Sequence, residues 1–288
     1  MLKFPTGFMN AYLLNKCRVA LSVPDHAMRD PAAGHRPAKQ CVASRTCRRE
    51  GDKRRRTSHR RIPRMGTLYL VRHAQASFGA QDYDQLSPRG HEQAARLGTY
   101  WRERGMRFDA VYTGTLRRHA QTLAGIAEGL QAAPEPLQAL PALNEYDSAA
   151  LITAIHPQPL PPADTPELYR KHFRLLCDAL AQWMGGTISP AGMPSWTGFS
   201  DGVRAVLDHV RRHHTGQNVL LVSSGGPIST AVGAVLSTPP EVTIALNMRI
   251  RNTAVTEFSI APKRLTLQTF NTLPHLDTPE HAGWATHA

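Results

Sequence analysis

A short apolar run that ends in two polar residues constrains this chain most. Residues 68–71 (Leu-Tyr-Leu-Val) are too few for a helix and predict a buried strand. Arg72 and His73 follow at once, so the strand places them at its carboxyl end, where ligands bind in open α/β sheets. An arginine and a histidine there can hold and attack a phosphoryl group. A strand that ends by chance in two polar residues explains this segment equally well.

Further strands alternate with amphipathic helices along the chain. Ser87 and Pro88 predict the N-cap and first turn of a helix with Ala94, Leu97 and Trp101 on one face. Other predicted strands cover 110–112 and 218–222, and predicted helices begin near Leu116 and after Ser223. Such alternation indicates parallel βαβ units. The sequence therefore predicts an α/β protein with a mostly parallel sheet.

Two regions depart from this alternation. Residues 253–260 and 265–270 flank a turn and predict an antiparallel pair at a sheet edge. After Leu143, five prolines between positions 157 and 166 predict irregular structure for much of the stretch, until a helix resumes around Tyr169.

The net charge of +12 is confined to one end of the chain. Residues 1–64 hold 16 of the 34 Lys and Arg residues and 4 of the 22 Asp and Glu residues, which leaves 18 of each in residues 65–288. We expect most of residues 1–64 to be disordered, because like charges with little apolar content between them cannot offset the entropy of ordering. They are either an extension upstream of a natural start at Met65 or a basic arm for nucleic acid or anionic lipid. The abrupt change at Met65 favours the extension.

Cysteine and apolar patterns set further bounds. The cysteines form neither a C-x-x-C pair nor a Cys/His zinc spacing, so the sequence supports no disulfide framework and no metal site. No run approaches the ~18 apolar residues of a membrane span. We therefore expect a soluble, cytoplasmic protein.

Several motifs together resemble a known family. Polar residues stand at or near strand ends as Arg72-His73, Arg118, Glu145 and the run from Ser223 to Gly226. With their neighbours they resemble the histidine phosphatase superfamily, the phosphoglycerate-mutase-like phosphatases. The segments that carry the resemblance are 70–74, 86–94, 113–122, 143–145 and 219–226. The resemblance spans nearly all of residues 65–275 and implies one catalytic domain over 65–288. It also implies a three-layer sandwich, with helices on both faces of a mostly parallel sheet and an antiparallel edge strand.

The resemblance implies a role for each motif residue. His73 would be the nucleophile that forms a phosphohistidine, and Arg72 and Arg118 would clamp the phosphoryl oxygens. Glu145 would act as general acid to the leaving oxygen and then as base for water. An ordinary solvated position remains the alternative for Arg118 and Glu145. Two further histidines are expected at surface or packing positions, namely His91 and His119.

Ser224 departs from the family pattern. The family commonly has a second histidine there, which contacts the phosphoryl group. We expect Ser224 and the backbone amide of Gly225 to bind phosphate instead, because the start of the following helix makes an anion site. A serine donates one hydrogen bond but carries no charge, and losing one such donor costs on the order of 10²–10³ in rate.

The predicted function is a metal-independent phosphomonoester hydrolase that works through phospho-His73, slowed by Ser224, and that needs no cofactor. Two alternatives stay open: a non-catalytic relative that binds phosphate ligands, and a phosphoglycerate-mutase-type phosphotransferase. The expected partner is a small phosphorylated substrate and not a membrane. Nucleic acid is expected only at the basic residues 1–64. The sequence identifies neither the substrate nor the oligomeric state.

Overall fold

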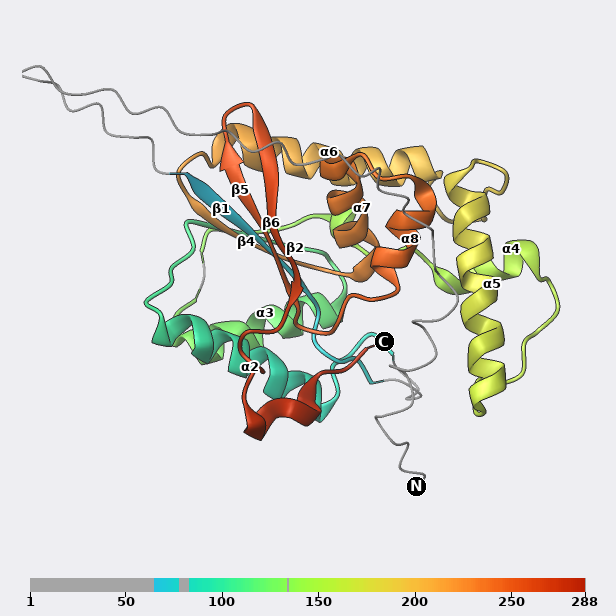
Figure 1. Ribbon diagram of the computed structural model, residues 1–288, viewed down its shortest axis with the longest axis horizontal. Coiled ribbons are helices and arrows are strands. Elements are labelled where there is room, and N and C mark those ends of the chain that lie inside the picture. The colour runs from blue at the N-terminus through green and yellow to red at the C-terminus, as the bar shows by residue number, and fades with distance from the viewer. Residues whose placement is uncertain (1–64, 78–82, 134, 288) are drawn as a thin grey trace, which may run out of the picture. The chain divides into compact units, whose positions relative to one another are not determined.

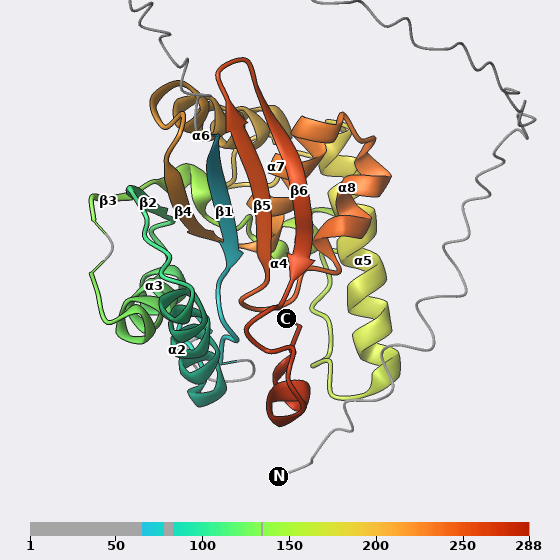
Figure 2. The same cartoon turned by 60° about the vertical axis from the view of Figure 1, so that its left-hand side comes forward.

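A six-stranded sheet forms the centre of the structure, which is a computed structural model that describes residues 65–77, 83–133 and 135–287 (Figure 1). The strand order is β3-β2-β4-β1-β5-β6 (Figure 2). The predicted basic extension, residues 1–64, lies outside the described residues. The strands are β1 (Gly66–Arg72), β2 (Ala110–Thr113), β3 (Leu137–Ala139), β4 (Asn218–Ser223), β5 (Val255–Ala261) and β6 (Arg264–Thr272).

Four of these strands are parallel, which brings their carboxyl ends to one edge. β4 pairs in parallel with β1 and with β2, and β2 pairs in parallel with β3. In this register Arg72 is opposite Ser223, and Thr113 is opposite Val222. The residues that follow β1, β2 and β4 therefore emerge side by side. β5 is antiparallel to β1 and to β6, which confirms the predicted antiparallel pair at the edge.

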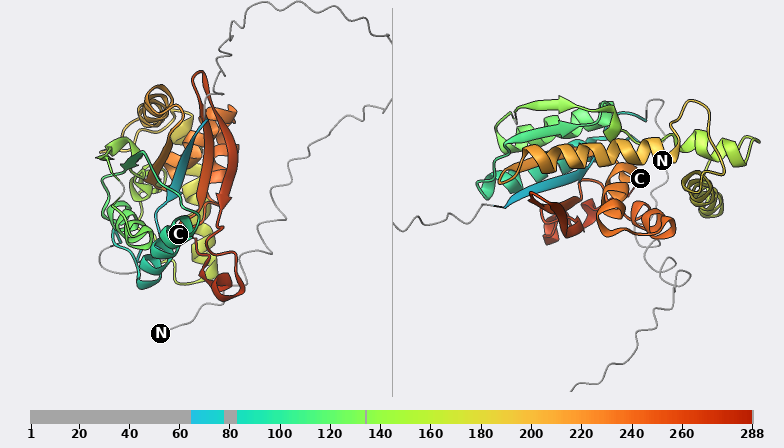
Figure 3. Two further views of the ribbon diagram at one scale, coloured as in Figure 1. Left: turned by 90° about the vertical axis from the view of Figure 1, so that its left-hand side faces the viewer. Right: turned by 90° about the horizontal axis from the view of Figure 1, so that it is seen from above.

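Helices cover both faces of the sheet, as predicted. α2 (Pro88–Glu103) and α3 (Arg117–Leu130) lie together on one face, and α6 (Trp196–His213) and α7 (Gly225–Leu236) lie on the other (Figures 1 and 3). Adjacent residues of a strand point to opposite faces. Val71 accordingly packs with the α2–α3 side, and Leu70 packs with the α6–α7 side. Both faces of the central strands are buried, which explains their continuous apolar runs.

The start of α2 confirms the predicted cap. The Oγ of Ser87 accepts a hydrogen bond from the backbone N–H of Gly90 at 3.0 Å, and Pro88 is the first helical residue. Proline suits this position because its missing N–H would have no partner within the helix.

The stretch after Leu143 is more regular than predicted. α4 (Ser148–Ile155) lies within it, so the prediction of irregular structure was wrong there, whereas residues 156–165, which hold four of the five prolines, form no helix or strand, as predicted. Pro166 is the first residue of α5 (Pro166–Met184), after the N-cap Thr165, and so begins a helix rather than preventing one. Figure 3 shows α4 and α5 at one end of the sheet domain.

Two further elements were not predicted at all, β3 and α8 (Pro240–Asn247). Both are short, so they show too few repeats of a strand or helix period. Across residues 65–77, 83–133 and 135–287, no helix combines the length and the apolar character needed to cross a membrane.

Candidate active site

His73 lies directly beyond β1, at the carboxyl edge of the sheet. Its side chain is 2% exposed, and its backbone N–H donates to the carbonyl of Ser223 at 2.8 Å. Its Nδ1 is 2.8 Å from the carbonyl oxygen of Ala74. A carbonyl only accepts, so Nδ1 carries the hydrogen, and the neutral ring presents an unprotonated Nε2.

The charge environment keeps this ring neutral. Burial lowers the pKa of His73 well below its usual 6.5, and the charges of Arg72 and Arg118 lower it further. A buried, neutral imidazole is a competent nucleophile at neutral pH.

Arg72 is held by the segment between α8 and β5. Its Nη1 donates to the carbonyl of Ile250, and Asn252 Nδ2 donates to the carbonyl of His73 at 3.1 Å. The Nε of Arg72 is buried, and no described residue accepts a hydrogen bond from it. Burial lowers the pKa of Arg72, whereas the Glu145 carboxylate raises it. One edge of the guanidinium is therefore anchored to the backbone.

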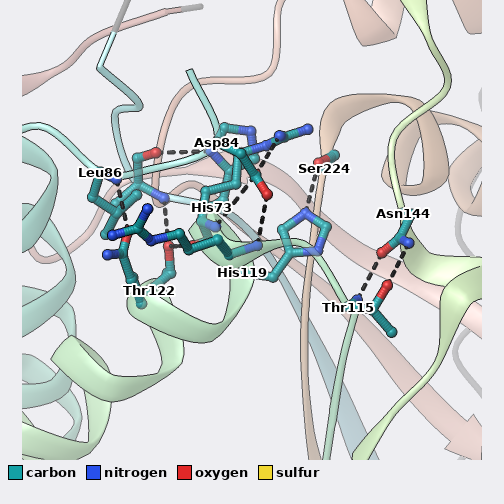
Figure 4. Close-up of polar contacts among 12 residues, drawn as sticks. His73, Asp84, Leu86, Thr115, His119, Thr122, Asn144 and Ser224 are labelled. Atoms are coloured by element: carbon teal, nitrogen blue, oxygen red, sulfur yellow. Dashed lines mark hydrogen bonds and ion pairs between the residues drawn. The ribbon is translucent and has the colours of Figure 1, made fainter. Parts of the chain in front are cut away.

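Arg118 lies in the first turn of α3, where Asp84 fixes it. Its Nη1 is 2.7 Å from Asp84 Oδ1, and Asp84 Oδ2 accepts from the backbone N–H of Arg117 at 2.9 Å. The N-cap residue Leu116 offers no capping side chain, so Asp84 caps α3 from a distant loop (Figure 4). The buried Nε of Arg118 has no partner within the described part of the chain. Asp84 was not predicted, because nothing local marks it as the cap of a helix that begins 33 residues later.

Thr122 and Gln121, from the same motif, have structural roles. Thr122 Oγ1 accepts from the backbone N–H of Ala74 at 3.0 Å and donates to the carbonyl of Arg118 at 2.7 Å. Gln121 Oε1 accepts from the backbone N–H of Leu86 at 2.8 Å. These bonds tie α3 to the chain that follows His73.

Glu145 lies at the N-terminus of α7. Its Oε1 and Oε2 are 3.0 and 3.2 Å from the backbone nitrogen of Gly226. Burial raises the pKa of Glu145, although this hydrogen bond and the charges of Arg72 and Arg118 oppose the rise. A Cβ at Gly226 would lie 2.2 Å from Oε1, so only glycine permits this approach. The expected anion site at this helix start is therefore taken, at Gly226, by a carboxylate of the protein itself.

Tyr146, the next residue, anchors the loop that carries Glu145. Its hydroxyl accepts from Asn247 Nδ2 at 2.7 Å, at the end of α8. Its ring packs edge-on against Trp183, with centroids 5.9 Å apart. Sequence reasoning missed both the tyrosine and α8.

Ser224 and Gly225 lie at the start of α7, as predicted. Gly225 is the first residue of the helix and is buried. Ser224 is its N-cap residue, yet its side chain makes no capping hydrogen bond. The Ser224 Oγ instead lies 2.7 Å from the Nε2 of His119. Their roles in phosphate binding remain predictions.

His119 is the main residue that sequence reasoning missed. It was predicted at a surface or packing position, and it is packed: its side chain is 0% exposed, and its ring centroid is 5.8 Å from that of His73. Its place directly after Arg118, together with the histidine missing at position 224, was the available signal. His91 is exposed on α2, consistent with a surface position.

The predicted residues thus converge on one site. Charges on Arg72 and Arg118 act on both His73 and Glu145. The site combines a neutral imidazole, two guanidinium groups whose buried Nε atoms have no partner among the described residues, and a carboxyl group whose pKa is raised by burial. In the described ranges, no three His, Cys, Asp or Glu side chains are grouped so as to hold a metal ion.

Comparisons with known proteins agree with this geometry. Residues 68–273 match the histidine phosphatase superfamily (branch 1). Over 63 residues the chain is 38% identical to a broad-specificity phosphatase of Saccharomyces cerevisiae; this match covers 20% of the chain and only 27% of that relative's length.

Solved structures show the same fold at low sequence identity. Phosphoglycerate mutase from Bacillus anthracis str. Sterne is similar with a TM-score of 0.53 and 19% identity, over 74% of this chain and 96% of that one. Phosphoserine phosphatase from Entamoeba histolytica, in complex with 3-phosphoglyceric acid, is similar with a TM-score of 0.52 and 21% identity. This match covers 74% of this chain and 100% of that one. Since the family match covers most of the chain, the chain belongs to the histidine phosphatase superfamily, whose phosphatase and mutase members share its fold.

Proposed function

We propose that this protein is a phosphomonoester hydrolase that works through a phosphohistidine on His73. The observation that carries the proposal is the hydrogen bond between His73 Nδ1 and the carbonyl of Ala74. It leaves the lone pair on Nε2, in a ring kept neutral beside two guanidinium groups. The substrate is a small phosphate monoester, in keeping with the phosphorylated compounds named for the fold's relatives.

In the first step, His73 Nε2 attacks phosphorus and a P–N bond forms while the P–O ester bond breaks. The leaving oxygen takes a proton from Glu145, whose pKa is raised by burial. Arg72 and Arg118 offset the charge that develops on the phosphoryl oxygens. Because two permanent cations supply this charge, the step needs no metal ion.

In the second step, water attacks phosphorus and the P–N bond breaks. Glu145, now ionised, accepts the proton from the water, and His73 leaves as neutral imidazole. Inorganic phosphate is released, and both residues return to their starting protonation states.

The test uses the full chain, with His73→Ala as the variant and His91→Ala as a matched control on the exposed face of α2. We expect the parent and the control to hydrolyse an aryl phosphate in the presence of EDTA. We also expect acid-labile phosphate on His73 by mass spectrometry, and neither result with His73→Ala. Turnover that survives in His73→Ala overturns the proposal. Phosphate binding without turnover in the parent supports a non-catalytic relative, and transfer to an alcohol in place of water supports a mutase.

A further inference from the structure

One buried histidine has no part in the proposed phosphoryl transfer. His119 is fully buried at the carboxyl edge of the sheet, between Ser224 and the Thr115–Asn144 pair (Figure 4). Its Nε2 lies 2.7 Å from Ser224 Oγ, and its ring centroid lies 5.8 Å from that of His73. Burying an imidazole costs free energy, so a histidine buried beside the proposed nucleophile is expected to have a function.

The environment of His119 selects one tautomer. Burial and the Arg118 charge lower its pKa to about 3, so the ring is neutral and carries a single hydrogen. Its buried Nδ1 has no hydrogen-bond partner among the described residues, and it faces Gly114, where a Cβ would lie only 2.1 Å away. The neighbouring Asn144 Oδ1 already accepts from the backbone N–H of Thr115 at 2.7 Å. An orphaned N–H is costlier than an unused lone pair, so the hydrogen belongs on Nε2.

That tautomer determines what the Ser224 hydroxyl does. His119 Nε2 donates to Ser224 Oγ, so the serine hydrogen must point to another acceptor. The serine hydroxyl does not cap α7. Its hydrogen could not bond to the free N–H groups at the helix start, because those groups are themselves donors. Ser224 follows Ser223, whose carbonyl accepts from the backbone N–H of His73 at 2.8 Å. The hydroxyl is 2.7 Å from the His119 Nε2, and the His119 ring centroid is 5.8 Å from that of His73, so the hydroxyl lies at the same edge of the sheet as His73.

We propose that His119 is a positioning residue that orients the Ser224 hydroxyl as a donor to the phosphoryl group. The histidine and the serine then act as one unit, which supplies the hydrogen bond that a histidine at position 224 would give. This inference rests on the proposed function for its catalytic consequence, but the tautomer and the phosphate contact can be measured without turnover.

The geometry also predicts that a histidine at position 224 cannot coexist with His119. The serine oxygen is already at hydrogen-bond distance from the ring, so an imidazole there would overlap it. Ser224→His alone is therefore expected to lower activity through overpacking. The double variant His119→Ala/Ser224→His has space for the new ring and is expected to regain at least tenfold over His119→Ala.

The kinetic test compares Ser224→Ala, His119→Ala and their double variant, with His91→Ala as the control. We expect Ser224→Ala to lower kcat on the order of 10²–10³, the effect of losing one oxyanion donor. His119→Ala is expected to lower kcat in the same direction, and the double variant to be no worse than Ser224→Ala. Unchanged kcat in Ser224→Ala, or losses that multiply in the double variant, overturn the inference.

A second measurement keeps this inference separate from the proposed function. Nitrogen-15 NMR of the histidine side chains is expected to show the His119 hydrogen on Nε2. Titration with inorganic phosphate is expected to bind at least tenfold more weakly to Ser224→Ala than to the parent. A hydrogen on Nδ1, or equal phosphate affinity, overturns the inference even if the protein is an active phosphatase. Turnover that is independent of His73 overturns the proposed function and leaves these two readouts to decide the role of His119.

Discussion

The carboxylate of Glu145 accepts a hydrogen bond from the backbone N–H of Gly226, with Oε1 3.0 Å from the nitrogen. This contact places the proposed general acid against the positive end of α7. It also explains why a glycine follows Gly225 here, since any side chain would displace the carboxylate.

Gly226→Ala is expected to lower kcat on the order of 10²-fold, because Glu145 must move away from its productive position. Alanine is favoured over glycine in helices by up to ~1 kcal/mol, but its Cβ would also lie 2.7 Å from ring atoms of Tyr146, so we expect the free energy of unfolding to fall as well. The measurement is kcat together with the free energy of urea unfolding. Gly198→Ala in α6 is the control, because a Cβ there meets Ser195 Oγ at an ordinary 3.5 Å. Wild-type kcat in Gly226→Ala contradicts the placement of Glu145.

The pH profile should reflect the raised pKa of Glu145 and the lowered pKa of His73. As pH rises through the Glu145 pKa the proton donor is lost, so phosphorylation of His73 slows at a higher pH than for an exposed glutamate. As pH falls, His73 stays a nucleophile to well below pH 6.5. Rapid-quench measurements of phosphohistidine formation, with an alkyl phosphate as the substrate, test both the high-pH and the low-pH parts of the profile.

Glu145→Gln serves as the matched control for that profile. In this variant we expect the phosphorylation rate no longer to fall as pH rises. We also expect the rate on the alkyl phosphate to be lower on the order of 10²–10⁴, the usual contribution of a general acid. An aryl phosphate with a good leaving group should lose much less, because it needs no proton. A fall in rate with rising pH that persists in Glu145→Gln belongs to another group, such as the substrate itself.

Asp84 should affect both the stability of α3 and the binding of phosphate by Arg118. Asp84→Ala removes a helix cap and the charged partner of Arg118, so we expect about 1 kcal/mol less unfolding free energy and weaker inhibition by phosphate. Asp84→Asn keeps an acceptor for the cap but loses the charge. It should therefore keep most of the stability, while its phosphate inhibition falls between the two. Equal phosphate inhibition in all three proteins would show that Asp84 does not position Arg118.

His275 should make stability depend on pH. Burial lowers its pKa to about 3, so the unfolded chain binds a proton below pH 6.5 that the native chain does not. Its contribution is therefore fully present above pH 6.5 and declines as pH falls towards 3, by at most ~1.4 kcal/mol per pH unit. The histidine is held by a hydrogen bond to Thr253 Oγ1 at 2.9 Å.

Urea unfolding at pH 7 and pH 5 measures this dependence. His275→Gln is expected to lose less stability between the two pH values than the parent does, whatever its stability at pH 7. The exposed His91→Gln should behave as the parent. Identical losses in His275→Gln and the parent would mean that His275 is not the group that titrates.

Much of the site could be predicted because its signals are local. The apolar run before Arg72, the cap at Ser87 and the order of the motifs each depend on neighbouring residues. Parallel pairing then brings the residues after β1 and β4 to the same edge, as expected of such strands. The prediction of irregular structure after Leu143 was wrong at α4, because eight residues are too few to show a clear helical period.

The sequence by itself determined the alternation of strands and helices, the motif residues and the strand ends that carry His73 and Ser224. Only the tertiary structure decided the partners of those residues. His119 meets Ser224 across 105 positions, and Asp84 meets Arg118 across 34. Local periodicity tells which face of an element is buried, but a buried polar side chain is satisfied by whichever group packing brings within reach, and that depends on the whole fold.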